Sequence, residues 1–225
     1  MEQSVEIGME AEQYDRWYKT SRGRWIGQRE LELLSNALRP QPGESLLDIG
    51  CGTGFFTRKM AGSNRGTVIG IDINPRWVDY ARRQNSAGAS YVVADAGELP
   101  FKDNAFDLVM SVAALCFIAD INAAIREMVR VTRRRFAVGL LNRHSLLWFK
   151  KGRHGGHGAY RGAQWLTVNE VKSMFSNHPV KNLTIKTAVH LPGGGLVSQH
   201  LEQFFPSRLP TGAFILIKGD VLDAA

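Results

Sequence analysis

Short apolar runs alternate with amphipathic stretches from residue 45 onward, as they do in proteins built of strand–helix units. Apolar runs bounded by glycine, proline or polar residues predict strands at 45–49, 67–73, 91–94, 106–111 and 136–141. Between them, apolar residues recur at helical spacing, most clearly after Asp120, where they follow an i, i+3, i+4, i+7, i+8 pattern. Alternating strands and helices predict an α/β fold with a parallel sheet and helices on both faces.

The two ends of the chain depart from this alternation. Residues 10–39 predict two helical pieces with a hinge near residues 21–23. Towards the other end, Thr167 and Glu170 form a capping box, the signature of a helix start. Residues 183–191 and 213–218 then predict two strands with no comparable helix between them. We therefore expect a seven-stranded, mostly parallel sheet whose last strand is antiparallel.

Length and composition place the chain among single-domain proteins. It has 225 residues, of which 44% are hydrophobic, and no apolar run reaches the roughly 18 residues needed to span a bilayer. The first residues are polar and acidic, so no signal peptide is expected. Two cysteines are too few for a disulfide framework or a thiolate metal site, which favours a cytoplasmic, reducing location.

The stretch Asp48-Ile49-Gly50-Cys51-Gly52-Thr53-Gly54 follows the first expected strand and is the most informative part of the chain. Glycines there allow a sharp turn and close approach of a ligand, at the sheet edge where open α/β folds bind ligands. The spacing differs from the dinucleotide fingerprint, because Phe55 stands where that motif has glycine or alanine. Asp48 would repel a pyrophosphate at this helix start but would suit an ammonium group.

Acids also follow the next two expected strands. Asp72 ends the second strand, where a carboxylate can accept hydrogen bonds from two ribose hydroxyls. Asp95 ends the third strand, where it can receive an exocyclic amine. Together with Asp48, these acids predict a ligand that has an amine, a ribose and an adenine, and no phosphate.

These stretches resemble the class I methyltransferases that use S-adenosylmethionine. They are most similar to the small stand-alone group with a type 11 methyltransferase domain, which includes ubiquinone and menaquinone biosynthesis methyltransferases. The resemblance is carried by residues 48–54, 68–72, 94–101 and 106–109, and it covers roughly residues 14–141. It implies a Rossmann-like fold, S-adenosylmethionine as the cofactor, no metal, and a methyl-transferring enzyme.

The resemblance also implies roles for individual residues. Asp48 and the glycines would hold the methionine end, Asp72 the ribose, and Asp95 with the Ala96 backbone the adenine. The early Tyr14-Asp15-Arg16-Trp17-Tyr18 looks like the N-terminal lid of the family. The expected cofactor-binding residues are Tyr14, Tyr18, Asp48, Gly50, Cys51, Gly52, Gly54, Asp72, Ile73, Asp95, Ala96 and Ser111. The single domain would divide into a helical lid (1–40), a cofactor-binding core (41–142), a basic insertion (143–166), and a C-terminal helix with strands (167–225).

The chain departs from the family pattern at positions that bear on the acceptor. Thr132-Arg133-Arg134-Arg135 replaces the usual Leu-Lys-Pro-Gly-Gly turn before the fifth strand. Ser111-Val112-Ala113-Ala114 stands where amino methyltransferases that act on adenine or glutamine amides have Asp/Asn-Pro-Pro-aromatic. The chain has no Pro-Cys pair and no acid at the end of the fourth strand. Neither cytosine C5 methylation nor magnesium-dependent catechol methylation is therefore expected.

Positive charge is concentrated in one part of the chain. The formal net charge is +7, and residues 126–172 hold eleven lysines and arginines against Glu127 and Glu170. The stretch 143–166 is longer than an ordinary loop and would overhang the ligand edge of the sheet. We expect it to close the acceptor pocket and to favour an anionic acceptor or a membrane surface, the alternative being a solvated basic loop. Its candidate acceptor-binding residues are Arg143, Arg153, Tyr160 and Arg161, and His144 is the candidate general base.

Methyl transfer from a sulfonium needs alignment and exclusion of water more than acid–base catalysis. The expected function is therefore S-adenosylmethionine-dependent methylation of a small-molecule or lipid-precursor acceptor by in-line transfer. Two alternatives stay open. One is a tRNA-modifying methyltransferase, which the basic segment would favour, and the other is a non-catalytic, cofactor-binding subunit that activates a partner. His154 and His157 lack a third ligand nearby, so no metal site is expected there, and the sequence gives no oligomeric state.

Overall fold

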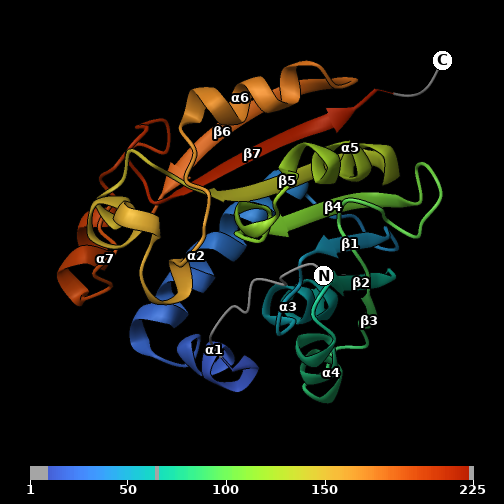
Figure 1. Ribbon diagram of the computed structural model, residues 1–225, viewed down its shortest axis with the longest axis horizontal. Helices are drawn as coiled ribbons and strands as arrows, with labels where there is room; N and C mark the ends of the chain where they lie inside the picture. Colours follow the sequence, from blue (N-terminus) through green and yellow to red (C-terminus); the bar gives the residue numbers. More distant parts are fainter. Residues whose placement is uncertain (1–9, 64–65, 223–225) are drawn as a thin grey trace.

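Seven strands form one sheet in the computed structural model, which describes residues 10–63 and 66–222 (Figure 1). The strands are β1 (Leu46–Ile49), β2 (Val68–Asp72), β3 (Ser90–Val93), β4 (Phe106–Val112), β5 (Thr132–Leu141), β6 (Val180–Ala188) and β7 (Phe214–Val221). Their order is β3-β2-β1-β4-β5-β7-β6. Neighbours run parallel except at β7, which is antiparallel to both β5 and β6. The expected seven-stranded α/β sheet with an antiparallel last strand is confirmed.

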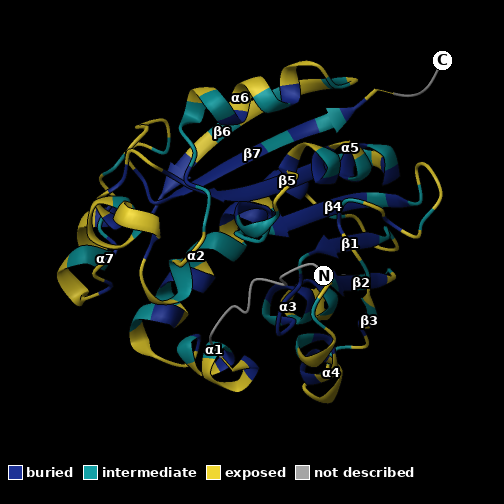
Figure 2. Cartoon of the chain, viewed as in Figure 1, coloured by how far each residue is buried: buried dark blue, intermediate teal, exposed yellow. Residues whose placement is uncertain are grey.

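Helices cover both faces of this sheet. They are α1 (Ala11–Trp17), α2 (Ser21–Leu38), α3 (Phe55–Ser63), α4 (Pro75–Arg83), α5 (Ile121–Val131), α6 (Val168–Ser176) and α7 (Leu196–Glu202). Figure 1 shows α5 and α6 in front of the sheet and α2 behind it. Because both faces are covered, the central strands are buried on both sides, as the dark blue strands of Figure 2 show. All four residues of β1 are buried.

The N-terminal helices are separate pieces, as expected. The chain leaves helical conformation between Trp17 and Ser21, just before the predicted hinge at 21–23. Thr20 caps the second piece, α2, because its side-chain oxygen accepts a hydrogen bond from the backbone N–H of Gly23 at 3.0 Å. The α2 helix then crosses behind the sheet and packs its leucine stripe, including Leu34 and Leu38, into the core.

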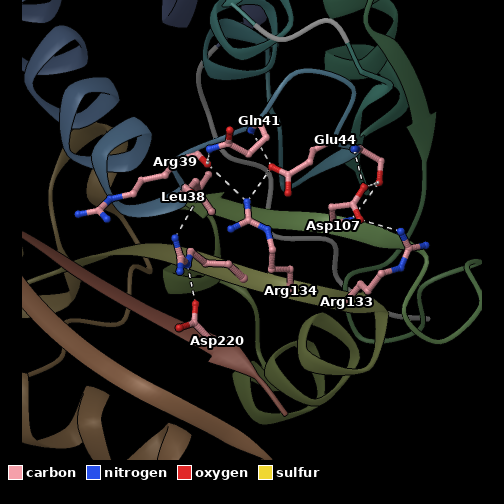
Figure 3. A network of polar contacts seen from close by, with 10 residues as sticks. Leu38, Arg39, Gln41, Glu44, Asp107, Arg133, Arg134 and Asp220 are labelled. Atoms are coloured by element: carbon pink, nitrogen blue, oxygen red, sulfur yellow. Dashed lines mark hydrogen bonds and ion pairs between the residues drawn. The ribbon is translucent and has the colours of Figure 1, made fainter. Parts of the chain in front are cut away.

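The fifth strand starts four residues earlier than the sequence predicts. Helix α5 ends at Val131 and β5 begins at Thr132, with no loop between them. The three arginines at 133–135 hid this start, since charged residues are uncommon at the beginning of a central strand. Each of them pairs with an acid from a neighbouring segment (Figure 3): Arg133 with Asp107 at 2.7 Å, Arg134 with Glu44 at 2.7 Å and Arg135 with Asp220 at 2.5 Å.

Residues 143–166 form a compact insertion rather than an open loop. It contains three short helical turns at Trp148–Gly152, Arg153–Gly155 and Gly158–Tyr160, and the buried Trp165 closes it against the core. Two other differences from the predicted elements lie nearby: β6 occupies 180–188 instead of 183–191, and α7 was not predicted. Among the described residues, no helix is long and apolar enough to cross a bilayer.

Candidate functional site

The loop between β1 and α3 turns sharply by using glycines with positive φ. Gly50 has a φ of +71°, and a Cβ at this position would lie 2.3 Å from the Cβ of Ala114. Gly52 has a φ of +55°, and a Cβ there would lie 3.2 Å from the Trp77 ring. A larger residue would strain the backbone at either position, and at Gly50 it would also collide with Ala114. The loop therefore keeps its backbone open at the carboxyl end of β1, where a ligand of a parallel sheet binds.

Asp48 lies at the base of this loop, almost completely buried. It is 2% exposed, and its carboxylate accepts a hydrogen bond from the Thr57 hydroxyl at 2.6 Å. Burial raises the pKa of Asp48 to about 7, and the negative charge of Asp72 adds to the rise. In the part of the chain that the structure describes, no cation pairs with Asp48. A buried acid in this state favours a positively charged ligand group, which would restore its ionised form.

The two other predicted acids lie along the same edge of the sheet. Asp72 accepts hydrogen bonds from the backbone N–H groups of Gly52 at 2.8 Å and Asn74 at 3.0 Å, and burial raises its pKa. It thereby holds the glycine loop, while its oxygens keep lone pairs for further donors. Asp95 is exposed and accepts a hydrogen bond from the Gly97 N–H at 2.8 Å. Asp48, Asp72 and Asp95 thus lie at the ends of β1, β2 and β3, the neighbouring strands at whose ends the sequence predicts them.

Three smaller predicted positions complete this edge. The exposed side chain of Ile73 follows Asp72 directly, with 67% of its surface accessible, and Ala96 is buried beside Asp95. Cys51 is buried, and burial raises the pKa of its thiol well above the usual range. Ser111 is also buried and donates its hydroxyl hydrogen to the carbonyl of Ile49 at 2.8 Å. Ser111 and Cys51 thus shape the loop, whereas Ile73 offers an apolar surface to a flat ligand.

An aromatic cluster covers the glycine loop. Tyr18 stacks on Phe55 with the ring centroids 3.8 Å apart, and Tyr14 lies 5.1 Å from the ring of Trp77. The two tyrosine hydroxyls are 3.4 Å apart. Sequence reasoning missed Trp77, although Asn74 and Pro75 fix the start of its helix and so place Trp77 in the first turn. The predicted lid residues and Trp77 therefore meet over one loop.

A buried ion pair fixes α1 to the same loop. Arg58 pairs with Asp15 at 3.0 Å, and the guanidinium also donates to the Thr53 carbonyl at 2.6 Å. The Thr53 hydroxyl itself is buried without a hydrogen-bond partner among the described residues. Because an unpaired buried hydroxyl is costly, Thr53 indicates that a ligand group completes the loop.

The predicted acceptor residues separate into two groups. Arg143 and His144 are both exposed and line a cavity of about 560 Å³ with Trp148, Phe149 and other side chains. Arg143 also pairs with Glu170 at 2.6 Å. His144 lies five residues beyond Gly139, the β5 residue level with the glycine loop, so it stands well past that loop.

The other group lies within the insertion. Arg153 is exposed, with its guanidinium 5.0 Å from the centre of the Phe149 ring. Tyr160 packs against Trp165 at 5.5 Å, whereas Arg161 is exposed on the following turn. The structure thus brings Arg143 and His144 together at the cavity and leaves Arg153 and Arg161 at the surface.

Glu30 is a candidate that sequence reasoning missed. It lies in line with the buried residues Gly27 and Leu34 on one face of α2 and is itself half-buried, where a carboxylate is out of place. Burial raises its pKa to about 8. Burial also raises the pKa of Tyr14, Tyr18 and Tyr160, and the negative charge of Glu30 adds to each of these shifts. Glu30 forms no ion pair within residues 10–63 and 66–222. An acid interrupting the leucine pattern of residues 26–38 was the signal that could have revealed it.

Comparison with known proteins agrees with this geometry. Residues 47–135 match the family described as a methyltransferase domain. Residues 47–135 carry a class I methyltransferase domain. S-adenosylmethionine is the cofactor of this class, so the recognition that rests on the glycine loop and its three acids is confirmed.

Relatives of this methyltransferase domain include the malonyl-[acyl-carrier protein] O-methyltransferase of Serratia marcescens. The two are 39% identical over 111 residues, which are 49% of this chain and 41% of that protein. The chain thus spans about half the length, or less, of the curated relatives of this kind that it matches.

Solved structures share the fold over a wider range. A methyltransferase of Thermotoga maritima superposes with a TM-score of 0.68 at 23% identity, covering 92% of this chain and 93% of that one. The geranyl diphosphate C-methyltransferase of Streptomyces coelicolor, solved with S-adenosyl-L-homocysteine, superposes with a TM-score of 0.64 at 16% identity and covers 87% and 76%. At these low sequence identities, the similarity shows that the chain shares the fold of these two proteins.

The residues of the methyltransferase site fit the cofactor on structural grounds alone. The buried Asp48 has no partner cation, the Thr53 hydroxyl has no acceptor, and a Cβ at Gly50 or Gly52 would close the cradle. Within the described residues, no group of three or more histidine, cysteine or acidic side chains could hold a metal.

Proposed function

We propose that this protein transfers the methyl group of S-adenosylmethionine to a small-molecule or lipid-precursor acceptor. The observation that carries the proposal is Asp48, an acid buried under a glycine loop, raised to a pKa of about 7 and without a protein cation. The sulfonium of the cofactor supplies an already activated methyl group. The protein's part is therefore to bind, align and exclude water.

In this proposal each acid along the edge of the sheet has one task. Asp48 and the glycine loop hold the charged methionine end, Asp72 the ribose hydroxyls, and Asp95 with the Ala96 backbone the adenine. Tyr14 and Tyr18 cover the loop and keep water out. The support is that the three acids lie at or just after the carboxyl ends of three adjacent parallel strands.

Glu30 is the group in this site best suited to accept a proton from the acceptor. It shares its surroundings with Tyr14, Tyr18 and Tyr160, the same tyrosines whose pKa its charge raises. An acid with a raised pKa is a stronger base, as a phenol, enol or amine acceptor requires. His144 stays the alternative base, with Arg143, Arg153, Tyr160 and Arg161 as candidate contacts to the rest of an anionic acceptor.

A tRNA acceptor is the second candidate, favoured by the basic composition of residues 126–172. The structure weakens that argument, because many of these arginines are already paired with acids. The paired ones are Arg130, Arg133, Arg134, Arg135 and Arg143. Binding to RNA phosphates needs cations that are free to replace the counterions of the RNA, and such cations lie mainly in the insertion.

The test is transfer of a radiolabelled methyl group from S-adenosylmethionine into a cell extract that is then split into RNA, protein, lipid and small-molecule fractions. We expect the label in a nuclease-resistant lipid or small-molecule fraction. Asp48→Asn serves as the control, because it should remove the label from every fraction. Label lost on nuclease treatment would make the acceptor RNA. Tight cofactor binding without transfer into any fraction would leave a binding subunit in place of an enzyme.

A further inference from the structure

Helix α7 presents its apolar side to solvent. Its buried residue is the acid Glu202, whereas Leu196, Val197 and Leu201 are 85%, 73% and 42% exposed. Phe204, on the turn that follows, is 69% exposed. A helix that covers a protein core turns its apolar stripe inward and its charges outward. In α7 this arrangement is reversed, and no other described residue covers its apolar stripe.

Glu202 fixes the helix in this orientation. Its carboxylate accepts hydrogen bonds from the backbone N–H groups of Val189 at 2.6 Å and His190 at 2.9 Å. The Nδ1 atom of His190 lies 3.1 Å from the same carboxylate, and the His190 ring stacks on Phe205 at 4.8 Å. A buried polar anchor thus holds the helix, and the exposed apolar side chains are not needed for its packing.

The insertion after β5 brings apolar side chains to the same corner of the molecule. Leu146 and Phe149 are 49% and 62% exposed, and they line the 560 Å³ cavity together with Leu191 and Phe205, which flank α7. Figure 1 places α7 beside the yellow helical turns of this insertion. Ten large apolar side chains are exposed among the described residues, and seven of them belong to this apolar corner: Leu146, Phe149, Leu196, Val197, Leu201, Phe204 and Leu209.

The charges around the apolar corner are of one sign. Residues 143–161 contain five lysines and arginines and no acid. Residues 189–212 contain Arg208 and a single acid, the buried Glu202. Lys150, Lys151 and Arg208 are exposed. The corner therefore combines exposed apolar side chains with a rim of cations and no exposed acid.

We propose that the apolar corner docks this protein onto the surface of an anionic phospholipid bilayer. An interfacial helix places its apolar face at the boundary of headgroups and acyl chains, while lysine and arginine stems reach the phosphates. Anionic lipids add attraction for each cation near the surface. The apolar side chains protrude singly from a helix and a turn, which suits a fluid surface better than a shaped protein groove. This proposal does not depend on the methyl acceptor.

Flotation of the whole chain with lipid vesicles tests the proposal. Vesicles of phosphatidylcholine alone are compared with vesicles that contain about 30% phosphatidylglycerol, at low and high salt. We expect at least about tenfold tighter binding to the anionic vesicles, weakened by salt. No binding to anionic vesicles at low salt would overturn the proposal.

Two variants and two matched controls separate the apolar and charged contributions. Leu196→Ser/Val197→Ser/Phe204→Ser and Lys150→Glu/Lys151→Glu should each weaken vesicle binding at least about tenfold. The controls Leu222→Ser and Arg76→Glu/Arg83→Glu, exposed residues elsewhere on the surface, should leave it unchanged. Cofactor binding by each variant shows that it is folded; if the triple variant fails this check, Leu196→Ser alone is used.

Other occupants of the corner give different results. Vesicle binding by the triple variant that equals the wild type would show that the corner is not the docking site. A change in mass by light scattering on mutation, without vesicle binding by the wild type, would make the corner a self-interface. Loss of a co-purifying acidic protein, again without vesicle binding, would make it a protein-docking surface. Each of these outcomes would overturn the lipid proposal.

Discussion

The two halves of the ligand edge follow different rules. On the cofactor side, the carboxylates of Asp48, Asp72 and Asp95 all accept hydrogen bonds from the backbone or from a neighbouring hydroxyl. On the other side, which includes the proposed acceptor residues, residues 142–166 and 189–212 hold a cavity and seven exposed large apolar side chains. The methyltransferase match ends at residue 135, just before the second half begins.

This difference separates the binding of the cofactor, which all enzymes of the class share, from the binding of the acceptor, which differs among them. Every class I enzyme must hold the same cofactor, so a few residue types at strand ends are enough to recognise that half. The other half, which we propose to bind the acceptor, has no such common ligand, and it is built from the insertion and the inverted helix α7. Variants on the cofactor side should therefore change cofactor binding or stability strongly and in a predictable direction. Variants in the rest of the site and in β5 should have smaller effects on kcat or stability.

The largest effect is expected at Asp48. Asp48→Asn keeps the shape and the hydrogen bond from Thr57 but removes the charge that would pair with the cofactor amine. Loss of a buried charge pair should weaken S-adenosylmethionine binding by at least about 100-fold. Binding to the wild type should also weaken as the pH falls below about 7, because protonation of Asp48 removes the same charge. Isothermal titration calorimetry from pH 6 to pH 9 measures both.

Stability provides the control for Asp48, with the opposite sign. The folded protein raises the pKa of this acid from 3.8 to about 7, so ionisation opposes folding and its cost is fully present above pH 7. Asp48→Asn should therefore be more stable than the wild type at pH 8 without cofactor, by about 1–3 kcal/mol. A variant that binds weakly because it is unfolded would instead melt at a lower temperature.

The glycine loop gives the next largest effect. Gly50→Ala places a Cβ 2.3 Å from that of Ala114 at a φ of +71° and should lower the free energy of unfolding by about 2–3 kcal/mol. Gly43→Ala is a matched control, because Gly43 has a φ of +89° but nothing within 4 Å of its Cβ position. It should cost only the backbone strain, about 1 kcal/mol. Equal melting temperatures in the two variants would show that the close approach at Gly50 is unimportant.

The sequence was informative where residue type and backbone position together define a ligand. Glycines that need positive φ and acids at strand ends predicted the cofactor edge, and apolar periodicity predicted five parallel strands with few errors. Prediction was poorer where tertiary pairing overrides the local pattern. Arg133 to Arg135 concealed the start of β5, because each is neutralised by an acid distant in sequence. Similarly, Glu202 is what buries the polar side of α7, and periodicity alone cannot reveal such an anchor.

Glu30, whose charge acts on Tyr14 and Tyr18 of the N-terminal segment and on Tyr160 of the insertion, gives the third test. If Glu30 accepts the acceptor's proton, kcat of the wild type should rise with pH and level off as Glu30 ionises. The midpoint of this rise should lie at or somewhat below pH 8, because the positive charge of the cofactor favours the ionised form of Glu30. Glu30→Gln should lower kcat by about tenfold and abolish that rise. His144→Gln is the comparison, since His144 lies in the cavity beyond the loop. A retained pH dependence in Glu30→Gln, and its loss in His144→Gln, would transfer the role to His144.

The smallest effect is expected at the arginines of β5, the strand that joins the two halves (Figure 3). Arg135 and Asp220 are 17% and 15% exposed, so Arg135→Met should cost about 1–2 kcal/mol at pH 7 by leaving a shielded acid poorly paired. Arg133 is 55% exposed, so Arg133→Met should cost less than about 0.5 kcal/mol.

The pH dependence of this difference identifies its cause. Burial raises the pKa of Asp220, whereas hydrogen bonds from Arg135 and Asn182 lower it. The lowering effect is the larger, so the net shift of the pKa is downward. An acid with a lowered pKa stabilises the fold above its unfolded pKa of about 3.9 and loses that contribution as the pH falls through the folded value. The gap between wild type and Arg135→Met should therefore narrow below about pH 4 in urea unfolding experiments. A gap that stays constant with pH would mean that the aliphatic part of Arg135, and not its charge, stabilises the junction of the two halves.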